Sequence, residues 1–215
     1  MIDAAPQLMS ADFQRIAPEK LKSFQGAQTA QVVDALGGRG ALDYRIKPLF
    51  ADQSLLCGTA LTCYAGAADN YGVAAALDLA KPGDILIVST NAHLDCAVVG
   101  DLVLGMCRNA GIAGFITDGA VRDSRGIRAA GLPCFAAGIS PNSPAMNGPA
   151  TVGKAIVMGG LAINAGDLIV TDEDGVVIVP AERIDQTIKR LAAVVQAEQA
   201  LLAQVDAGKR SMLKN

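Results

Sequence analysis

The sequence predicts a single α/β domain that carries an additional layer of β-sheet and ends in a long helix. The chain has 215 residues and a hydrophobic content of 51%, which is enough for one sizeable core. Strand-like and helix-like stretches alternate in the first part of the chain, and strand-like stretches cluster later, before a final helical stretch. Neither an internal repeat nor a linker is visible, so we expect one domain over residues 1–215.

The first part of the chain alternates between helical and strand patterns. Apolar residues recur at helical spacing after Thr29, and the pair Gly37-Gly38 stops this helix. A turn at Lys81-Pro82-Gly83 leads into an apolar strand. The expected elements are a helix over 29–36, a strand over 58–64, an Ala-rich helix over 71–79, a strand over 84–89, a polar loop over 90–95, a helical stretch ending near 109, and a strand over 111–117.

The second part of the chain contains an unpatterned segment between predicted strands. Residues 138–153 include three prolines and two asparagines without periodicity, which predicts a structured loop or flap that covers a site. The other expected elements are a short helix over 124–130, a strand over 133–137, strands over 155–158, 167–171 and 175–179, and a helix over about 181–206.

Composition excludes several classes of partner. The formal net charge is -3 and most basic residues are scattered, so neither nucleic acid nor an anionic membrane is an expected partner. The first ten residues lack a basic leader followed by an apolar run, and apolar stretches end well short of about 18 residues. We therefore expect a soluble cytoplasmic protein.

The metal-binding and nucleophilic residue types are few. Five cysteines occur without a Cys-x-x-Cys pair and among apolar or small residues, so we expect buried free thiols. His93 is the only histidine, which supports neither a His-rich metal site nor an ordinary Ser-His-Asp triad. A metal bound here would need oxygen ligands, which Mg²⁺ and Mn²⁺ accept.

The stretch from Gly111 to Asp123 is the most informative part of the sequence. An apolar strand runs into a Gly-containing turn that bears Asp118, Arg122 and Asp123, and ligand sites in α/β sheets form at such strand ends. The Asp123 carboxylate can bind a hard cation, and the Arg122 guanidinium can grip a substrate carboxylate. The alternative is a local Arg-Asp ion pair that caps the helix beginning at Ser124.

A second candidate position precedes this stretch. Gly100 and Asp101 lie close to a helix start, where unpaired backbone N–H groups favour an anion. The alternative for Asp101 is an ordinary acidic residue that complements the helix dipole. Other polar residues have structural interpretations: Asp172 and Asp174 as turn formers, and Asp118 as an acceptor that stabilises a turn. For His93, in the polar loop, a substrate contact stays open.

The spacing of these residues resembles a known family. Asp101, twenty intervening residues and then Arg122-Asp123 are similar to the Asp-x20-Arg-Asp signature of the 4-hydroxy-4-methyl-2-oxoglutarate aldolases and their RraA-like relatives. The likeness covers almost the whole chain, including Gly58-Thr-Ala, the stretch 81–88, Gly159-Gly160 and the stretch 165–180. The resemblance implies a swivelling β/β/α type of α/β domain, assembled as a trimer or a pair of trimers.

The resemblance also implies a reaction and residue roles. The reaction is metal-dependent cleavage of a small 2-oxo acid to pyruvate, by aldol cleavage or by oxaloacetate decarboxylation. Asp123 would be the direct protein ligand of Mg²⁺ or Mn²⁺, and Asp101 would orient a water on the metal. Arg122 would bind the keto oxygen and stabilise the developing enolate. The backbone N–H groups of Leu102 and Val103, next to Gly100, would hold the substrate carboxylate.

Two further acidic residues match positions that the family uses. Asp34 matches an acidic residue of the first helix, and Glu198 matches a glutamate from the C-terminal helix of a neighbouring subunit. Periodicity independently places Glu198 on the apolar stripe of that helix, between Val195 and Leu202. A carboxylate on a packing face needs a partner, unless the helix end is frayed and exposed there. The resemblance implies that this helix packs on a neighbouring subunit.

Two departures from the family bear on the substrate. The segment 141–146 lacks the basic residue that aldolases of the family can carry there, and Asp34 is shorter than the glutamate of some aldolases. The main alternative function is that of a non-catalytic RraA-like regulator that binds ribonuclease E or another protein. Such regulators lose the aspartate after the arginine, whereas Asp123 is present here. A methyltransferase is disfavoured because no Gly-rich cofactor loop follows the first strand.

Overall fold

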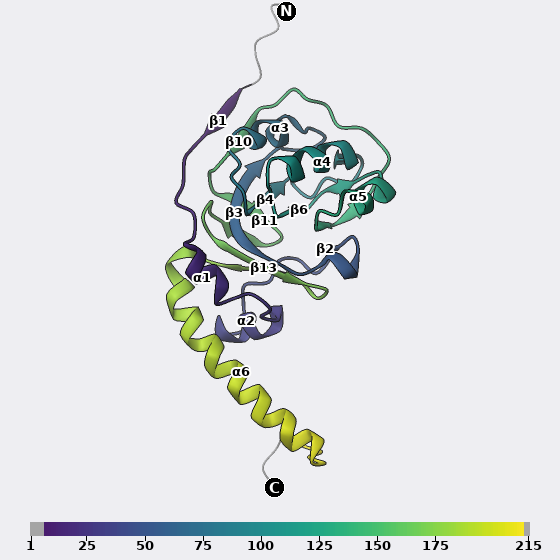
Figure 1. Ribbon diagram of the computed structural model, residues 1–215. Helices are drawn as coiled ribbons and strands as arrows, with labels where there is room; N and C mark the ends of the chain where they lie inside the picture. The colour runs from purple at the N-terminus through teal and green to yellow at the C-terminus, as the bar shows by residue number, and fades with distance from the viewer. Residues whose placement is uncertain (1–6, 213–215) are drawn as a thin grey trace, which may run out of the picture.

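The computed structural model describes residues 7–212, so the ends of the predicted domain, 1–6 and 213–215, lie outside the described residues. Its centre is a mixed sheet (Figure 1). Four adjacent strands of this sheet are parallel. The sheet path is β1 (Leu8–Ser10), β10 (Ala150–Val152), β3 (Leu56–Tyr64), β4 (Asp84–Ser89), β6 (Gly114–Thr117), β8 (Cys134–Ala136) and β2 (Lys47–Pro48). The hairpin β13 (Leu168–Asp172) and β14 (Gly175–Val179) joins it through β3.

The central strands are buried on both faces, and this explains why they are apolar without alternation. On one face of β4, Leu86 and Val88 pack under helices α3 (Tyr71–Leu77), α4 (Asp101–Asn109) and α5 (Ser124–Ala130). On the other face, Ile85 and Ile87 pack against the hairpin β11 (Ile156–Met158) and β12 (Leu161–Ile163) and the inner side of β13 and β14.

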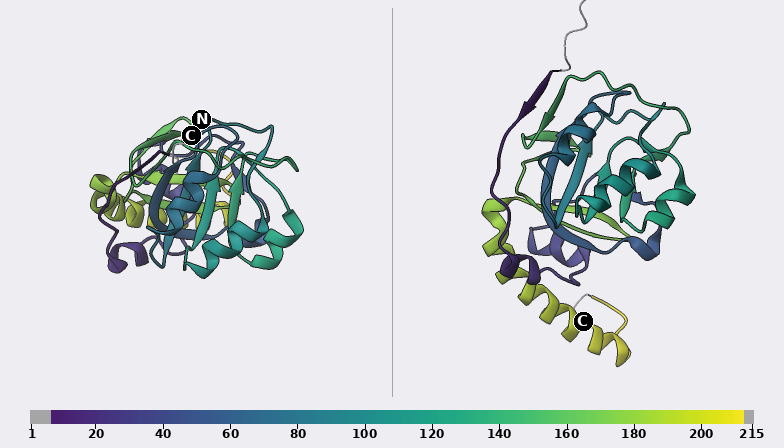
Figure 2. Two further views of the ribbon diagram at one scale, coloured as in Figure 1. Left: turned by 90° about the horizontal axis from the view of Figure 1, so that it is seen from above. Right: turned by 45° about the horizontal axis from the view of Figure 1, so that its top comes forward.

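A third apolar layer joins the terminal helices to the hairpin β13–β14. Its residues include Val32 and Ala35 of α2 (Thr29–Ala35) and Leu191 of α6 (Ile184–Asp206). Short helices α1 (Pro18–Lys22) and η2 (Ala181–Arg183) lead into this layer, and η1 (Ala51–Gln53) precedes β3. Figures 1 and 2 show α2 and α6 on the side of the sheet away from α4 and α5.

The C-terminal half of α6 runs beyond the rest of the domain (Figure 1). Its apolar residues Leu202 and Val205 are 57% and 50% exposed, so the apolar stripe lacks cover within one protomer. No helix of the described part of the chain is both long and apolar enough to cross a membrane.

A separate small parallel sheet carries three short strands in the order β5 (Ala97–Val99), β7 (Ala120–Val121) and β9 (Gly138–Ile139). The sequence patterns do not predict this sheet. β5 lies between the predicted polar loop over 90–95 and the helix start near Gly100, where no strand was expected, and β7 lies in the predicted Gly-containing turn. β9 and β10 lie in the segment expected to be a structured loop over 138–153. The expectation of a loop over the whole of 138–153 was wrong, because β9 and β10 pair with neighbouring strands there. Strands of two or three residues are too short to show a periodic pattern, so only tertiary pairing reveals them.

Candidate active site

The small parallel sheet gathers the predicted polar residues at one edge. Its strands β5 and β7 run directly into Gly100-Asp101 and Arg122-Asp123. The third strand, β9, runs into Ser140 and the segment that follows. Because the carboxyl ends of parallel strands meet at the same edge, residues distant in sequence come together there. The structure thereby explains why an aspartate and an Arg-Asp pair twenty residues apart form one cluster.

Asp101 opens helix α4 and lies against helix α5. Its Oδ1 accepts the backbone N–H of Leu102 at 2.7 Å. A Cβ at Gly126 of α5 would lie 2.0 Å from Asp101 Oδ2, so the glycine makes room for this carboxylate. Among the described residues the Val103 N–H has no hydrogen-bond partner, whereas the Leu102 N–H is already occupied. Of the two predicted backbone donors, Val103 is therefore the one free to bind an anion.

Asp123 holds an uncommon backbone conformation at the start of α5. Its φ of 61° and ψ of 43° lie in the left-handed region, which aspartate tolerates better than most residues. Its side chain makes no capping hydrogen bond, so the alternative that this carboxylate caps the helix is wrong. The ion pair of that alternative is present, with Arg122 Nε 3.3 Å from Asp123 Oδ2. The Asp123 side chain is 48% exposed, which leaves its carboxylate accessible.

Gly100 lies directly against the side chains of Arg122 and Asp123. A Cβ at position 100 would lie 2.4 Å from Asp123 Oδ2 and 3.2 Å from Arg122 Cγ. The Gly100 backbone itself is ordinary, with φ of -128°, so the glycine is needed for space and not for conformation. Arg122 is tied to the neighbouring strand because its backbone N–H donates to the Val99 carbonyl at 3.0 Å.

Replacing Gly100 by alanine is expected to weaken divalent-metal affinity about tenfold or more while leaving thermal stability nearly unchanged. The new methyl group displaces a flexible carboxylate end and not the backbone. Gly105→Ala, on the same helix with no atom near the added Cβ, is the matched control. Mn²⁺ titration and thermal melts of both variants measure the effect. Wild-type affinity in Gly100→Ala would remove Asp123 from the metal site.

The donor atoms of the cluster fit a hard divalent cation. The described residues contain no group of three or more His, Cys, Asp or Glu side chains placed to hold a metal. One or two carboxylates at an accessible edge nevertheless suit Mg²⁺, which keeps several waters. The cysteines offer no alternative, because all five are free and burial raises the pKa of Cys63 and Cys134 to about 12. The prediction of buried free thiols is confirmed for four of them, and Cys57 is half-buried.

Asp34 and Glu198 do not reach this cluster within one protomer. Both belong to the layer of α2 and α6, on the other side of the sheet (Figure 1). Glu198 is exposed, and its Oε2 accepts a hydrogen bond from Gln31 Nε2 of α2 at 2.5 Å. The expected partner for this carboxylate is thus a polar side chain of the same chain, and a role in a second subunit stays a prediction.

The remaining conspicuous residues have structural partners. Asp172 accepts the N–H and hydroxyl of Thr29, both at 2.8 Å, besides the N–H of Asp174. The Asp174 carbonyl accepts a hydrogen bond from Lys47 Nζ. His93 precedes β5, whereas Asp101 follows it, so the two residues lie at opposite ends of this strand. The backbone N–H of His93 donates to the Thr90 hydroxyl. The structure gives no contact that supports a substrate role for His93.

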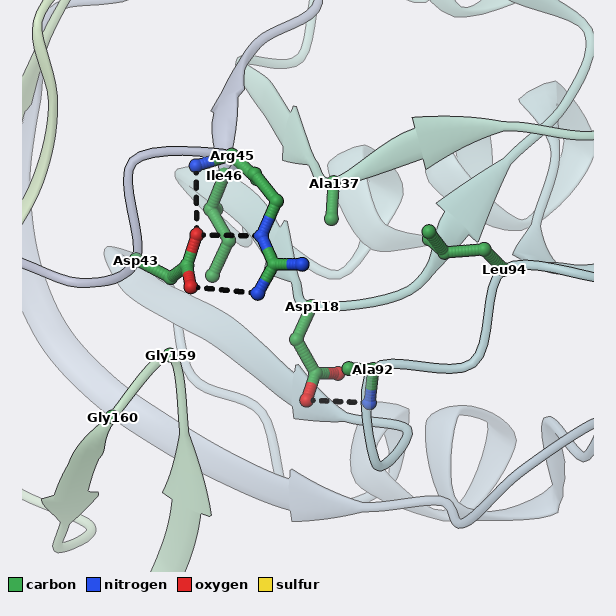
Figure 3. A pocket seen from close by; sticks show the side chains of 9 residues that line it. All are labelled: Asp43, Arg45, Ile46, Ala92, Leu94, Asp118, Ala137, Gly159 and Gly160. Atoms are coloured by element: carbon green, nitrogen blue, oxygen red, sulfur yellow. Dashed lines mark hydrogen bonds and ion pairs between the residues drawn. The ribbon is translucent and has the colours of Figure 1, made fainter.

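A cavity of about 190 Å³ lies at the carboxyl ends of β4, β6 and β8 (Figure 3). Its polar groups are already paired: Arg45 binds Asp43 through two nitrogens, which holds the pKa of Asp43 at about 2. The buried Asp118 accepts hydrogen bonds from Thr90 and from the Ala92 N–H, so its predicted role as a turn acceptor is confirmed. Since these groups satisfy one another, we place the candidate site at Asp123.

The protein is a mixed α/β domain with a C-terminal helix, and this fold is similar to that of solved RraA-fold structures. A structure of an uncharacterized protein from Pseudomonas syringae pv. tomato matches with a TM-score of 0.79 and 26% identity, covering 92% of this chain and 97% of that one. The RNA-processing inhibitor RraA from Thermus thermophilus matches with a TM-score of 0.65 and 25% identity, covering 72% and 93%. The predicted fold class is confirmed.

The family follows from the sequence comparison. The model of the RraA-like family, described as Aldolase/RraA, matches residues 29–178, and the chain belongs to this family. A protein of Halalkalibacterium halodurans named "Putative 4-hydroxy-4-methyl-2-oxoglutarate aldolase" is 35% identical over 170 residues, which cover 79% of this chain and 80% of that protein. The matched range contains Asp34, Asp101, Arg122 and Asp123, whereas Glu198 lies beyond it.

Proposed function

We propose that this protein is a divalent-metal-dependent lyase that cleaves a small 2-oxo acid to pyruvate. Aldol cleavage of a 4-hydroxy-4-methyl-2-oxoglutarate type of substrate and decarboxylation of oxaloacetate are both included. The observation that carries the proposal is the Asp123 carboxylate, accessible beside Arg122 at the edge where β5 and β7 end. The aldolase name of the Halalkalibacterium halodurans relative supports the same reaction class.

Each residue of the cluster has a separate role in such a cleavage. A bound Mg²⁺ or Mn²⁺, held by Asp123, would supply Lewis acidity. Arg122 binds the keto oxygen and stabilises the negative charge that develops there. The N-terminus of α4, with the free Val103 N–H, binds the substrate carboxylate beside Gly100. Asp101 orients water at the site.

The two reactions differ in their need for a base. When the C3–C4 bond of a hydroxylated substrate breaks, its electron pair forms pyruvate enolate, and the C4 hydroxyl must lose its proton to a base. When oxaloacetate loses carbon dioxide, the same enolate forms without that deprotonation. Protonation of C3 then gives pyruvate in both cases. A cluster of one arginine and two aspartates therefore suffices for decarboxylation, and the aldol reaction needs a further acidic group or an activated water.

We propose that the further acidic groups are Glu198 and Asp34, supplied across a subunit interface of a trimer or hexamer. Helices α2 and α6, which carry them, lie on the other side of the sheet from α5, which follows Asp123 (Figure 1). The exposed Leu202 and Val205 beside Glu198 give the projecting end of α6 an apolar surface suited to a neighbouring subunit.

The experiment that tests the function is the release of pyruvate from oxaloacetate and from 4-hydroxy-4-methyl-2-oxoglutarate, before and after chelation. We expect activity to disappear with EDTA and to return with Mg²⁺ or Mn²⁺, because an oxygen donor set favours hard cations. Full activity after exhaustive chelation would contradict the metal mechanism.

The shared site gives a separate expectation for mixed oligomers. Glu198→Gln should keep the oligomer size and lower kcat, and mixing it with Asp123→Asn should restore partial activity because some interfaces then carry both intact residues. Native mass spectrometry must first show that subunits exchange. If no mixture recovers activity despite exchange, Glu198 acts within its own subunit or has no role.

A regulator of RNA processing is the second candidate, because the Thermus thermophilus neighbour is described as an inhibitor of this kind. An accessible Asp123 beside Arg122 favours the lyase. A ribonuclease E cleavage assay with the purified protein separates the two functions. Inhibition of the ribonuclease without any pyruvate release would replace the lyase by the regulator.

A further inference from the structure

Hydrogen bonds anchor the segment after β9 beside the candidate site. Next to β9, the Ser140 N–H donates to the Val121 carbonyl at 3.0 Å, one residue before Arg122. The Ser140 hydroxyl and the Asn142 side-chain amide both donate to the Asp95 carbonyl, at 3.0 and 2.8 Å. The Ala97 N–H completes this anchor by donating to the Asn142 carbonyl at 3.0 Å.

A second anchor holds the far side of the same segment. The buried Asp69 carboxylate accepts the backbone N–H groups of Asn147 and Gly148 at 2.6 and 3.2 Å. Ala145 exchanges backbone hydrogen bonds with residues 68 and 70. Ser143 thus lies between two anchored points, so its position relative to the small sheet is fixed although its side chain is exposed.

Ser143 engages the arginine of the candidate site. Arg122 Nη1 donates a hydrogen bond to Ser143 Oγ, while Arg122 Nε faces Asp123 Oδ2. The guanidinium therefore has an acceptor at each of two edges, and this pair of contacts favours one orientation of its plane. Because the Ser143 oxygen accepts this bond, the hydroxyl hydrogen stays available to donate to another group.

We infer that Ser143 is a positioning residue for Arg122 and a specificity residue for the part of the substrate beyond the keto group. This inference rests on the proposed function. No cationic side chain occurs in the segment 141–146, so the donor offered there is neutral. A hydroxyl donor suits short 2-oxo acids whose far end carries a small acceptor, such as an alcohol or a single carboxylate oxygen. The neutral hydroxyl gives no strong preference for a substrate that carries two negative charges at the end remote from the keto group.

The test compares Ser143→Ala with Ser143→Thr, which retains a hydroxyl, and with Asn147→Ala as the matched control. The Asn147 side chain is exposed on the same segment, and only its backbone N–H is used. ¹⁵N NMR of the Arg122 guanidinium, assigned with Arg122→Lys, reports whether rotation of this group is hindered without substrate. Steady-state kinetics with oxaloacetate and 4-hydroxy-4-methyl-2-oxoglutarate report kcat and KM separately.

We expect Ser143→Ala to free guanidinium rotation and to lower kcat/KM about tenfold, mainly through kcat, with Ser143→Thr and Asn147→Ala close to wild type. Hindered rotation and wild-type kinetics in Ser143→Ala would overturn the inference. If the wild-type protein released no pyruvate, the proposed function would fail, and the NMR comparison would still decide whether Ser143 positions Arg122.

Discussion

Asp123→Asn is expected to abolish pyruvate release at every attainable concentration of Mg²⁺ or Mn²⁺. The substitution keeps the size of the side chain and removes the negative charge that holds a hard cation. Asparagine also tolerates the left-handed backbone of position 123, so the fold should be preserved. The measurement is a metal titration of activity together with a thermal melt.

The control for this prediction is Asp52→Asn, which also removes an exposed carboxylate that pairs with an arginine. Asp52 pairs with Arg128 at 2.9 Å on the molecular surface, and this exposed ion pair contributes little to stability. Both variants should melt near the wild-type temperature, and only Asp123→Asn should lose activity. Rescue of Asp123→Asn by excess metal would show that another group holds the ion.

Arg122→Ala is expected to lower kcat/KM by on the order of a hundredfold or more, as loss of a donor to a developing oxyanion does. The guanidinium lies against Asp123, and its outer nitrogen reaches Ser143, so the truncation removes the cation from the centre of the cluster. The effect should fall mainly on kcat, since the charge on the keto oxygen develops during bond cleavage.

The matched control is Arg128→Ala on α5, the same helix that Asp123 begins. Arg128 is exposed and binds Asp52 and the Phe50 ring, outside the cluster. Its kinetics should stay at the wild-type level. Unchanged kinetics in Arg122→Ala would exclude Arg122 from the site, and an equal loss in both variants would indicate a general effect of removing positive charge.

The longer elements of the fold could be predicted from local patterns. The predicted strand over 84–89, helix over 124–130 and strand over 175–179 coincide with β4, α5 and β14. An apolar run that follows the Pro82-Gly83 turn predicts β4. The left-handed Gly131 ends α5, and Asp172-Glu-Asp-Gly175 closes the last hairpin. These signals are local, so tertiary contacts do not change them.

The residues of the cluster could be predicted from the sequence, but the contacts between them could not. Arg122 and Asp123 stand out in a turn after a predicted strand, Asp101 stands out near a predicted helix start, and their spacing indicates the family. The sheet that unites them has strands of two or three residues, whose pairing depends on contacts distant in sequence. Ser143 could not be predicted for the same reason. The segment 138–153 shows no periodic pattern, and only the pairing of β9 with β7 brings Ser143 beside Arg122.

The most direct test of the account is electron paramagnetic resonance of Mn²⁺ bound to the wild-type protein and to Asp123→Asn. We predict that the wild-type protein binds one Mn²⁺ per protomer and that pyruvate, as a 2-oxo acid, changes the spectrum of the bound ion. Asp123→Asn should leave Mn²⁺ free in solution. Equal Mn²⁺ binding by both proteins, or a wild-type spectrum that pyruvate does not alter, would contradict a 2-oxo acid site built on Asp123.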